Sequence, residues 1–463
     1  MTTTSTPPPV VTGFGGEILT PATEGYDAAR RVWNHAVDRY PALILRCTDT
    51  DDVVAAVAHA RREGLPIAVR AGGHSMAGLS VCDDGLVVDL TPMRRVSVDA
   101  VARVATVQAG VIWRELDAAT QAHGLAVPGG EVSDTGVAGL TLGGGIGWIG
   151  RRHGLSCDNL RGATVVTASG ETVHASLDEH PDLFWALRGA GANFGIVTEL
   201  ELGLHPVGPQ LYGGELIHPG YRDVDALTVL LEHASAVTED VRLMAALVTA
   251  PEAPFVPPEA RGQQVCVIVG AHCGDLDSGR AALEPLRAFG PPVVDMLREM
   301  SYVELQQTVD KTIPAGRHAY VKSDFLARLD ERALAVLAEH HMTATSPHCQ
   351  ILVHQMGGAL AREPVGGTAF PNRDAEWMLT VIAMWTDPNE EAEPHVAWAR
   401  SLWQAMRPWS AGTYVNHLGD EGAHRVREAY GASYARLVAL KEQWDPDNVF
   451  RHNQNLAPRL HVG

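Results

Sequence analysis

The segment at residues 70–75, with the sequence RAGGHS, constrains the fold more than any other part of the chain. It directly follows an apolar run at 65–69 that predicts a buried strand. Gly72 and Gly73 allow a sharp turn that brings backbone N–H groups close to an anionic ligand, and Arg70 adds a positive charge. We therefore expect a strand that ends in a phosphate-binding loop, with His74 placed where the next part of a long nucleotide cofactor would lie.

Length and charge restrict the class of protein. A chain of 463 residues is too long for one ordinary hydrophobic core, so we expect two domains. The net charge of −19 argues against nucleic acid or an anionic membrane as a partner, and no apolar stretch reaches the ~18 residues of a membrane span. Because the first ten residues lack a signal-peptide pattern and the six cysteines form no C-x-x-C pair, we expect a cytoplasmic protein with buried free thiols.

Local patterns in the first half predict a strand–helix–strand unit that delivers the RAGGHS segment. Its helix begins near Asp49 and ends at Gly64. Period-two alternation predicts hairpins further along the chain. The expected strands lie at 42–47, 65–69, 86–90, 96–98, 104–108, 164–168, 171–175 and 194–204.

The second half has a different texture, in which strand-like apolar runs alternate with helical patterns up to about residue 410. This alternation predicts a second α+β domain with an extended sheet. The final segment at 421–443 has one apolar stripe and predicts a single helix that Pro446 prevents from continuing. The strand-like runs lie at 265–269, 350–354 and 379–384, and a helical pattern lies at 331–341.

Two more glycine-rich segments follow, GVAGLTLGGGIG at 136–147 and GAGANFG at 189–195. Glycine costs conformational entropy, so we expect something to approach the backbone closely there, and a dinucleotide is the natural candidate. Neither segment has the G-x-G-x-x-G spacing with an acidic residue about 20 positions later. A nicotinamide-dependent dehydrogenase of the Rossmann type is therefore disfavoured, and tight turns between strands remain the alternative for each segment taken alone.

These motifs occur in a fixed order together with GLSCDN at 154–159, DLFWALRG at 182–189, YVN at 414–416 and WDPDNVFRHNQN at 444–455. The set resembles the FAD-linked oxidases of the vanillyl-alcohol oxidase superfamily, which carry a PCMH-type FAD-binding domain, and within them the berberine bridge enzyme-like branch. The resemblance implies a two-domain α+β fold. Residues 1–206 and a returning segment at 411–463 would bind FAD, around a substrate domain at 207–410 built on a large antiparallel sheet covered by helices.

The resemblance also implies how FAD is held. His74 would be bonded covalently to the flavin 8α-methyl group. Many relatives add a second bond from a cysteine, but that position is Val132 here and packing explains Cys157 better, so a single attachment is expected. Contacts with FAD are implied for Arg70, Ala71, Gly72, Gly73, Ser75, Gly129, Gly130, Val132, Gly136, Val137, Gly139, Leu140, Gly143, Gly144, Gly145, Gly147, Asn159, Gly195, Ile196, Val197, Tyr414, Asn453 and Asn455.

The activity that the resemblance implies is hydride transfer from a CH–OH or CH–NH group of a small or medium metabolite to flavin, which O2 reoxidises to give H2O2. Val137 occupies a position where small residues leave room for oxygen in relatives. Sugar-oxidising relatives have Tyr-x-Asn-Tyr where this chain has Tyr414, Val415, Asn416 and His417. His417 is therefore a candidate base, with Tyr414 holding substrate or sharing the role; packing of His417 is the alternative, and an amine substrate would need a base less.

Other interpretations stay open at this stage. They are a tailoring enzyme for natural products, a flavin-dependent dehydrogenase and a flavoprotein without turnover. Lys322 and Gln355 lie on expected strands that could face the flavin or be ordinary sheet residues. Arg373 suggests a structural salt bridge, and the adjacent His340 and His341 point in different directions on a helix, so no metal site is expected. A monomer or a homodimer is compatible with the sequence.

Overall fold

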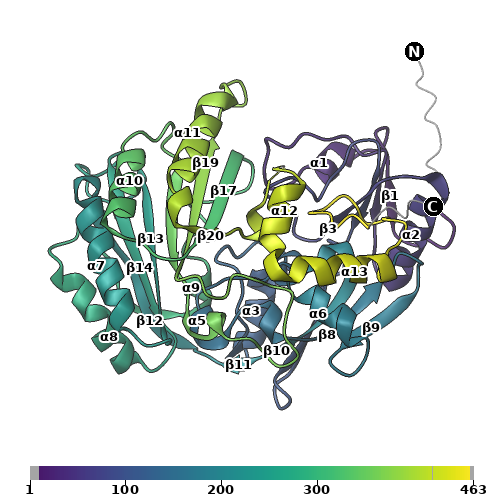
Figure 1. Ribbon diagram of the computed structural model, residues 1–463, viewed down its shortest axis with the longest axis horizontal. Helices are drawn as coiled ribbons and strands as arrows, with labels where there is room; N and C mark the ends of the chain where they lie inside the picture. Colours follow the sequence, from purple (N-terminus) through teal and green to yellow (C-terminus); the bar gives the residue numbers. More distant parts are fainter. Residues whose placement is uncertain (1–9, 420, 459–463) are drawn as a thin grey trace.

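The computed structural model describes residues 10–419 and 421–458, which fold into two regions that lie side by side (Figure 1). One region holds the N-terminal half of the chain and the C-terminal helices, and the other is dominated by a large antiparallel sheet. This is an α+β architecture of the kind that the sequence predicts. Within the described residues no helix is both long and apolar enough to cross a membrane.

The first sheet carries the RAGGHS segment at the end of one strand. The expected strand–helix–strand unit is present as β2, α2 and β3, and α2 begins where the Asp49 side chain accepts a hydrogen bond from Asp52 N (3.0 Å). However, β4 lies between β2 and β3 and runs parallel to both, so β3 is at the edge. The bounds are β1 (Glu17–Leu19), α1 (Tyr26–Arg30), β2 (Leu43–Arg46), α2 (Thr50–Glu63), β3 (Ile67–Arg70) and β4 (Leu86–Asp89).

The second sheet has the order β5-β6-β10-β8-β9 and is antiparallel throughout, so both predicted hairpins are confirmed. The glycine segment at 136–147 contains the short helix α4 rather than a continuous loop. The elements are β5 (Val96–Asp99), β6 (Val104–Gln108), α3 (Trp113–Gln121), α4 (Val137–Leu142), α5 (Gly150–His153), β8 (Leu160–Val166), β9 (Thr172–Ser176), α6 (Pro181–Ala190) and β10 (Ile196–Gly203), with β7 (Leu125–Ala126) paired to β11 (His205–Pro206).

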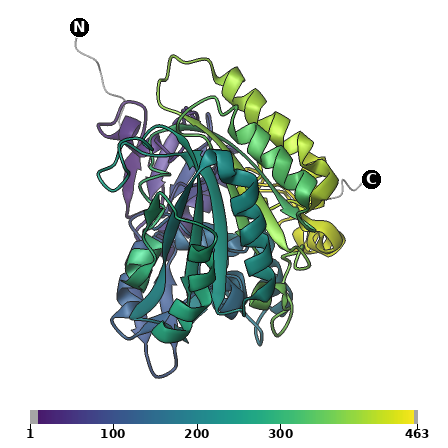
Figure 2. The ribbon, with the colours of Figure 1, turned by 90° about the vertical axis from the view of Figure 1, so that its left-hand side faces the viewer.

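The large sheet has the order β15-β12-β14-β13-β18-β19-β17-β20, with β16 also paired to β12. Helices α7, α8, α10 and α11 cover one face, which Figure 2 shows in front of the strands. The strands are β12 (Gln210–Pro219), β13 (Val241–Thr249), β14 (Gln264–His272), β15 (Val294–Asp295), β16 (Arg298–Ser301), β17 (His318–Leu326), β18 (Gln350–Gln355), β19 (Trp377–Trp385) and β20 (Ser410–Gly412). The helices are α7 (Asp223–Ala236), α8 (Leu276–Ala288), α9 (Tyr302–Gln306), α10 (Glu331–His341) and α11 (Ala392–Ala405).

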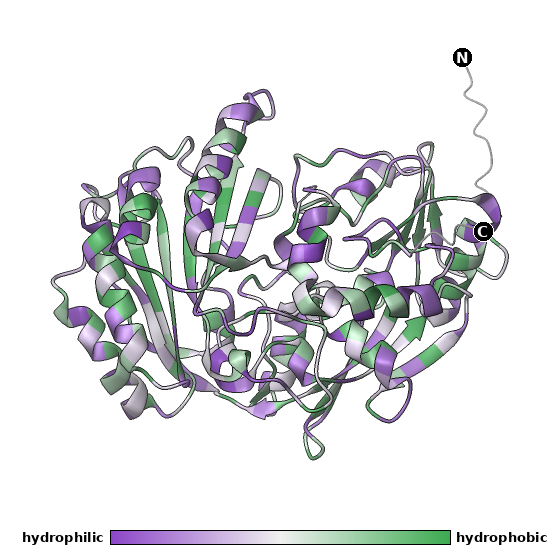
Figure 3. Cartoon of the chain, in the orientation of Figure 1, coloured by the Kyte–Doolittle hydropathy of each residue, from purple (hydrophilic) through white to green (hydrophobic). Residues whose placement is uncertain are grey.

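Hydrophobicity explains why the helices stay on that face. Hydrophobic residues concentrate in the strands of the large sheet, whereas the covering helices also carry hydrophilic residues (Figure 3). In α11 the buried positions His395, Trp398, Ala399 and Leu402 recur at helical spacing, so one stripe packs on the sheet. The opposite face of the sheet is also buried and turns toward the N-terminal region.

The C-terminal segment differs from the single helix that the sequence predicts. Two helices, α12 (Ala423–Tyr430) and α13 (Tyr434–Trp444), are separated by a 3-10 turn that starts at Gly431 with a φ of 46°. A left-handed backbone conformation at that glycine interrupts the helix although the apolar stripe continues. Both helices pack into the same hydrophobic core as the N-terminal sheets, so the two ends of the chain meet in one core.

Candidate active site

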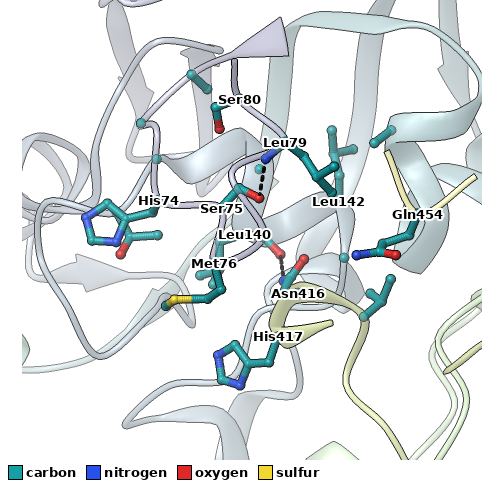
Figure 4. Close-up of a pocket in the computed structure, with 18 of the residues that line it drawn as sticks. His74, Ser75, Met76, Leu79, Ser80, Leu140, Leu142, Asn416, His417 and Gln454 are labelled. Carbon is teal, nitrogen blue, oxygen red and sulfur yellow. Dashed lines mark hydrogen bonds between the residues drawn. The ribbon is translucent and has the colours of Figure 1, made fainter. Parts of the chain in front are cut away.

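A cavity of about 350 Å³ lies where the N-terminal loops, the uncovered face of the large sheet and the C-terminal segment meet. Figure 4 shows side chains from the loop after β3 and from the segment around Asn416 projecting toward this space. Its lining includes His74, His354, Tyr414 and Asn453. Segments far apart in the sequence therefore share a single site.

Two glycines hold the loop after β3 against the start of the second glycine segment. A Cβ on Gly72 would clash with the backbone of Gly136, and a Cβ on Gly136 would clash with the backbone of Gly72. The next residue, Gly73, has a φ of 72°, which glycine adopts without strain. The close contact of these two backbones fixes the position of the loop, and with it the positions of His74 and Ser75 at the cavity.

The sequence predicts that the glycines at 143–147 allow a dinucleotide to approach the backbone, but the structure shows another need for them. Added Cβ atoms at Gly143, Gly144, Gly145 and Gly147 would collide with protein atoms, namely Asn416, Phe370, Ser156 and the backbone of Gly129. Close packing of the protein on itself therefore explains these positions. At Gly139, by contrast, an added Cβ would meet no atom of the described residues within 4 Å, and Gly139 lines the cavity.

His74 is held in place on two sides. Its Nε2 lies 2.8 Å from Asp134 Oδ1, and its ring stacks on Trp33 with centroids 5.3 Å apart. The hydrogen bond from His74 is the main reason why the pKa of Asp134 is lowered. With Nε2 engaged by Asp134, Nδ1 is the ring nitrogen left for another partner.

Arg70 forms an ion pair with Asp89 and does not face a phosphate site. Its guanidinium Nη2 lies 2.5 Å from Asp89 Oδ2, the Asp89 side chain is completely buried, and Arg70 is not part of the cavity lining. The positive charge expected for a phosphate is thus balanced by Asp89. The loop brings backbone groups to the cavity, and the arginine secures the strand behind them.

Tyr414 and Asn416 form a small hydrogen-bonded unit beside α4. The Tyr414 hydroxyl oxygen accepts hydrogen bonds from Gly145 N (2.9 Å) and Asn416 Nδ2 (2.9 Å). Asn416 Nδ2 also donates to Leu140 O (3.0 Å), as Figure 4 shows. Burial raises the pKa of Tyr414 far above neutral pH. The phenol therefore stays protonated and can donate its own proton in a hydrogen bond.

His417 is a half-buried residue whose imidazole is neutral. Its ring meets the Tyr414 ring edge-on at 5.0 Å, and its Nδ1 has no hydrogen-bond partner among the described residues. Burial, helped by the neighbouring His354, lowers the pKa of His417 to about 4. Packing alone does not account for an unpaired ring nitrogen on the cavity lining.

Three residues that sequence reasoning missed lie beside His417. Glu131 and His354 line the cavity, and Arg242 on β13 stands behind them with its Nη2 2.5 Å from Glu131 Oε1. His354 Nδ1 lies 3.3 Å from the same carboxylate oxygen. His354 is at the end of the strand that the sequence predicts at 350–354. Side chains alternate between the two faces of a strand, and the sequence does not say which of the two sets faces the ligand.

Lys322 and Gln355 point to the opposite face of the sheet and are therefore not cavity residues. Lys322 forms an ion pair with Glu421 and lies over the Trp403 ring, while its neighbour Val321 lines the cavity. Gln355 Oε1 accepts from Leu243 N (3.1 Å) and its Nε2 donates to Ala234 O (3.0 Å). Both are satisfied sheet residues. Arg373 likewise forms a buried salt bridge, 2.6 Å from Asp158.

The remaining expected contacts divide into two groups. In the cavity lining are Ala71, Gly72, Gly73, His74, Ser75, Gly130, Val132, Gly136, Gly139, Leu140, Gly143, Gly195, Ile196, Val197, Tyr414, Asn416, His417 and Asn453. Outside it are Arg70, Gly129, Val137, Gly144, Gly145, Gly147, Asn159 and Asn455. Val137 is completely buried in the core, and Asn159 Nδ2 donates to the carbonyls of His153 (2.9 Å) and Leu155 (2.8 Å), so both act in packing.

Comparison with known proteins identifies the class. Residues 41–176 match the family model described as FAD binding domain, and residues 413–457 match the model described as berberine and berberine like. These segments carry the RAGGHS loop, the glycine segment and Tyr414, which meet at the cavity. The fold and the site are those of a FAD-linked oxidoreductase with a PCMH-type FAD-binding fold.

The chain belongs to the berberine bridge enzyme-like family of FAD-linked oxidoreductases. It is 32% identical to (R)-6-hydroxynicotine oxidase of Paenarthrobacter nicotinovorans over 461 residues, covering 96% of this chain and 97% of the relative. It is also 32% identical over 430 residues to a FAD-linked oxidoreductase of Dictyostelium discoideum, covering 92% and 91%. The crystal structure of 6-hydroxy-D-nicotine oxidase from Arthrobacter nicotinovorans superposes with a TM-score of 0.87 at 29% identity, covering 96% and 98% of the two chains.

The residues around the cavity fit FAD. The buried Oδ1 of Asn453 and Nδ1 of His417 have no partner among the described residues, so each can meet a polar atom of a bound ligand. Gly139 leaves open space beside them, and the backbone turns at Gly72 and Gly73 border the same cavity. FAD is the cofactor of this family, and these groups would hold it.

Proposed function

We propose that this protein is an oxidase that removes hydride from a CH–OH or CH–NH group of a small or medium metabolite and passes the electrons to O2, with release of H2O2. Bound FAD would supply the hydride acceptor. The observation that carries the proposal is the single cavity, which joins the glycine loops and His74 to a wall bearing His354 and His417. The relatives named as oxidases support the same chemistry.

We further propose that the substrate is compact and largely apolar. The sheet contributes Val321, Leu352, Met378 and Ile382 to the lining, with Thr380 and His354 as its polar members, and the loop before β17 adds Ile313. An apolar wall with few polar groups favours one oriented alcohol or amine over an oligosaccharide, whose many hydroxyl groups would be left unpaired.

We propose that FAD is attached through His74 alone. Asp134 engages Nε2, so Nδ1 would carry the bond. Val132 borders the cavity where a cysteine would be needed for a second bond, and Cys157 is completely buried, with burial raising the pKa of its thiol well above the ordinary value. In the same proposal, residues 1–206 and 411–463 form the FAD domain and 207–410 the substrate domain; β20 extends the large sheet to Gly412, just past that boundary.

In this scheme the chain's own residues orient the substrate. Tyr414 donates its hydroxyl hydrogen to the substrate oxygen or nitrogen while Gly145 and Asn416 hold the phenol. His417 presents an uncharged ring nitrogen to the same group. The apolar wall excludes water from the reacting C–H bond.

The test begins with flavin attachment. Purified protein is denatured in acid, and flavin is measured in the pellet and in the supernatant for the wild type and for the His74→Ala and Cys157→Ala variants. Flavin should stay in the pellet for the wild type and for Cys157→Ala, and leave it for His74→Ala. Free flavin from the wild type would disprove covalent attachment.

Oxygen consumption is then followed with a panel of compact alcohols and amines that includes 1-phenylethanol and (R)-6-hydroxynicotine. Oxygen uptake matched by peroxide formation is the expected result. Reduction of artificial dyes without oxygen uptake would show a dehydrogenase and would contradict the proposal.

A further inference from the structure

A charged cluster of two buried side chains and one half-buried carboxylate, Glu131, lies on the sheet side of the cavity. It consists of Glu131 before α4, Arg242 on β13 and His354 on β18, and we name it the Glu131 cluster. The side chains of Arg242 and His354 are 1% and 3% exposed. Arg242 Nη2 lies 2.5 Å from Glu131 Oε1, and His354 Nδ1 lies 3.3 Å from that same oxygen.

The chemistry of the three groups determines where the protons lie. A guanidinium only donates hydrogen bonds and keeps its charge, so Arg242 favours an ionised Glu131. Burial opposes ionisation of Glu131, but His354 and Arg242 outweigh it and lower the pKa of Glu131 to about 2. His354 Nδ1 lies 3.3 Å from Glu131 Oε1 and 3.5 Å from Arg242 Nη2. The carboxylate is the nearer partner, and because it accepts hydrogen bonds it favours the tautomer with the hydrogen on Nδ1.

The other ring nitrogen of His354, Nε2, then carries a lone pair that is free to accept a proton. His354 Nε2 is buried and has no hydrogen-bond partner among the described residues, and the residue lines the cavity. A histidine oriented by a carboxylate on one side and open to a substrate on the other has the arrangement of a general base.

We propose that His354 is the catalytic residue that accepts the substrate proton, and that Glu131 and Arg242 are its positioning residues. This inference rests on the proposed function. In alcohol oxidation, the substrate O–H bond breaks and its proton binds His354 Nε2. The adjacent C–H bond breaks, its hydride carries two electrons to the flavin oxidant, and a C=O double bond forms. The positive charge on the imidazole is balanced by the Glu131 carboxylate.

The other candidates for the base lack such support. Tyr414 holds its proton because burial raises its pKa. His417 Nδ1 has no hydrogen-bond partner among the described residues, and burial lowers the pKa of His417 to about 4 although Glu131 acts in the opposite direction, so a proton there would be poorly stabilised. The charged and titratable groups that surround His354 are Glu131, Arg242 and His417, with Arg151 of α5 near Arg242.

The first test measures the hydrogen position directly and needs no substrate. Nitrogen NMR of isotope-labelled histidine in the flavin-containing protein identifies the ring tautomer, and the His354→Gln variant assigns the resonance. The wild type should show His354 with hydrogen on Nδ1 and a bare Nε2. The Glu131→Gln variant should lose this preference, because an amide can donate to Nδ1 as well as accept from it. An unchanged tautomer in Glu131→Gln would overturn the positioning role.

The second test is anaerobic flavin reduction by 1-phenylethanol and by (R)-6-hydroxynicotine, followed by flavin absorbance. His354→Gln should slow reduction by the alcohol by about 10²- to 10⁴-fold, the usual contribution of a general base. Reduction by the amine should slow much less, because a neutral amine releases hydride without first losing a proton. Glu131→Gln should slow the alcohol reaction but add little in a His354→Gln background, since it acts through His354.

The matched control is His340→Gln, the same exchange on α10 outside the cavity, which should leave both rates unchanged. Flavin content is measured for each variant so that lost cofactor is not mistaken for lost catalysis. A full alcohol rate in His354→Gln would overturn the inference while leaving the proposed function intact. A wild type that neither probe reduces would overturn the proposed function and, with it, this inference.

Discussion

Replacing Lys441 by methionine should destabilise the C-terminal segment strongly. Lys441 is completely buried at the end of α13, and its ammonium donates to Asp445 Oδ2 (2.6 Å), Asn193 O (2.7 Å) and Phe450 O (2.9 Å). Asn193 and Phe450 both line the cavity. This one side chain therefore joins the returning segment to the glycine loop at 189–195.

The magnitude follows from what the substitution leaves behind. Methionine fills much of the same volume, but among the described residues Asp445 would keep only the backbone N–H groups of Val449 (2.7 Å) and Phe450 (2.9 Å) as donors to its charged carboxylate. Breaking a buried ion pair by removing one partner costs about 3–5 kcal/mol. Lys441→Met should lower the free energy of unfolding of this region by that amount and weaken FAD retention.

The assay is urea denaturation followed by tryptophan fluorescence, with flavin release measured on the same samples. Lys311→Met, at an exposed position, is the matched control and should leave the midpoint unchanged. Adding Asp445→Asn to Lys441→Met should recover part of the loss, because the unpaired charge is removed. A loss below about 1 kcal/mol for Lys441→Met alone would refute the reasoning.

Three further predictions follow from other buried groups. Burial raises the pKa of Asp117 to about 7, so the folded state keeps a proton that the unfolded chain loses above the ordinary pKa of 3.8. The free energy of unfolding must therefore fall as pH rises between these two values. Asp117→Asn should remove that fall, measured as urea midpoints from about pH 4 to 8. Gly72→Ala should displace the contact with Gly136 and abolish FAD binding, measured as flavin per protein, whereas Gly15→Ala, whose added Cβ would make only an ordinary 3.6 Å contact with Asp52, should retain FAD. Tyr414→Phe should leave the buried Gly145 N–H unpaired at a cost of about 1–3 kcal/mol, seen in the same denaturation assay; an unchanged midpoint would contradict it.

Glycine loops and residue spacing predicted the local elements, and the order of the motifs carried the resemblance that implied the two-domain fold and FAD. The RAGGHS loop after a buried strand, the hairpins and the helix ending at Gly64 depend on local conformational preferences, which short segments express by themselves. The same local logic could not foresee the break between α12 and α13, because the apolar stripe continues through Gly431. Backbone conformation at one glycine overrode a regular pattern.

The partners of charged residues were beyond local reasoning. Arg70 reads as a free charge beside a phosphate loop, yet the parallel pairing of β3 with β4 puts it opposite Asp89. Lys322 and Gln355 lie on the correct strands but project from the face away from the cavity, and His354 occupies the face toward it. A shift of one residue along a strand reverses the face, so only the assembled sheet distinguishes them.

By itself the sequence determined the class of enzyme, through its resemblance to a known family, and it predicted the loops and His74 as FAD contacts, because that resemblance rests on motifs whose residues are close together in the chain. The tertiary structure alone decided the composition of the reactive wall, where Glu131, Arg242, His354 and His417 come from four separate segments. Contacts between distant segments arise from sheet register and from the packing of the two regions, and neither is encoded in the spacing of neighbouring residues.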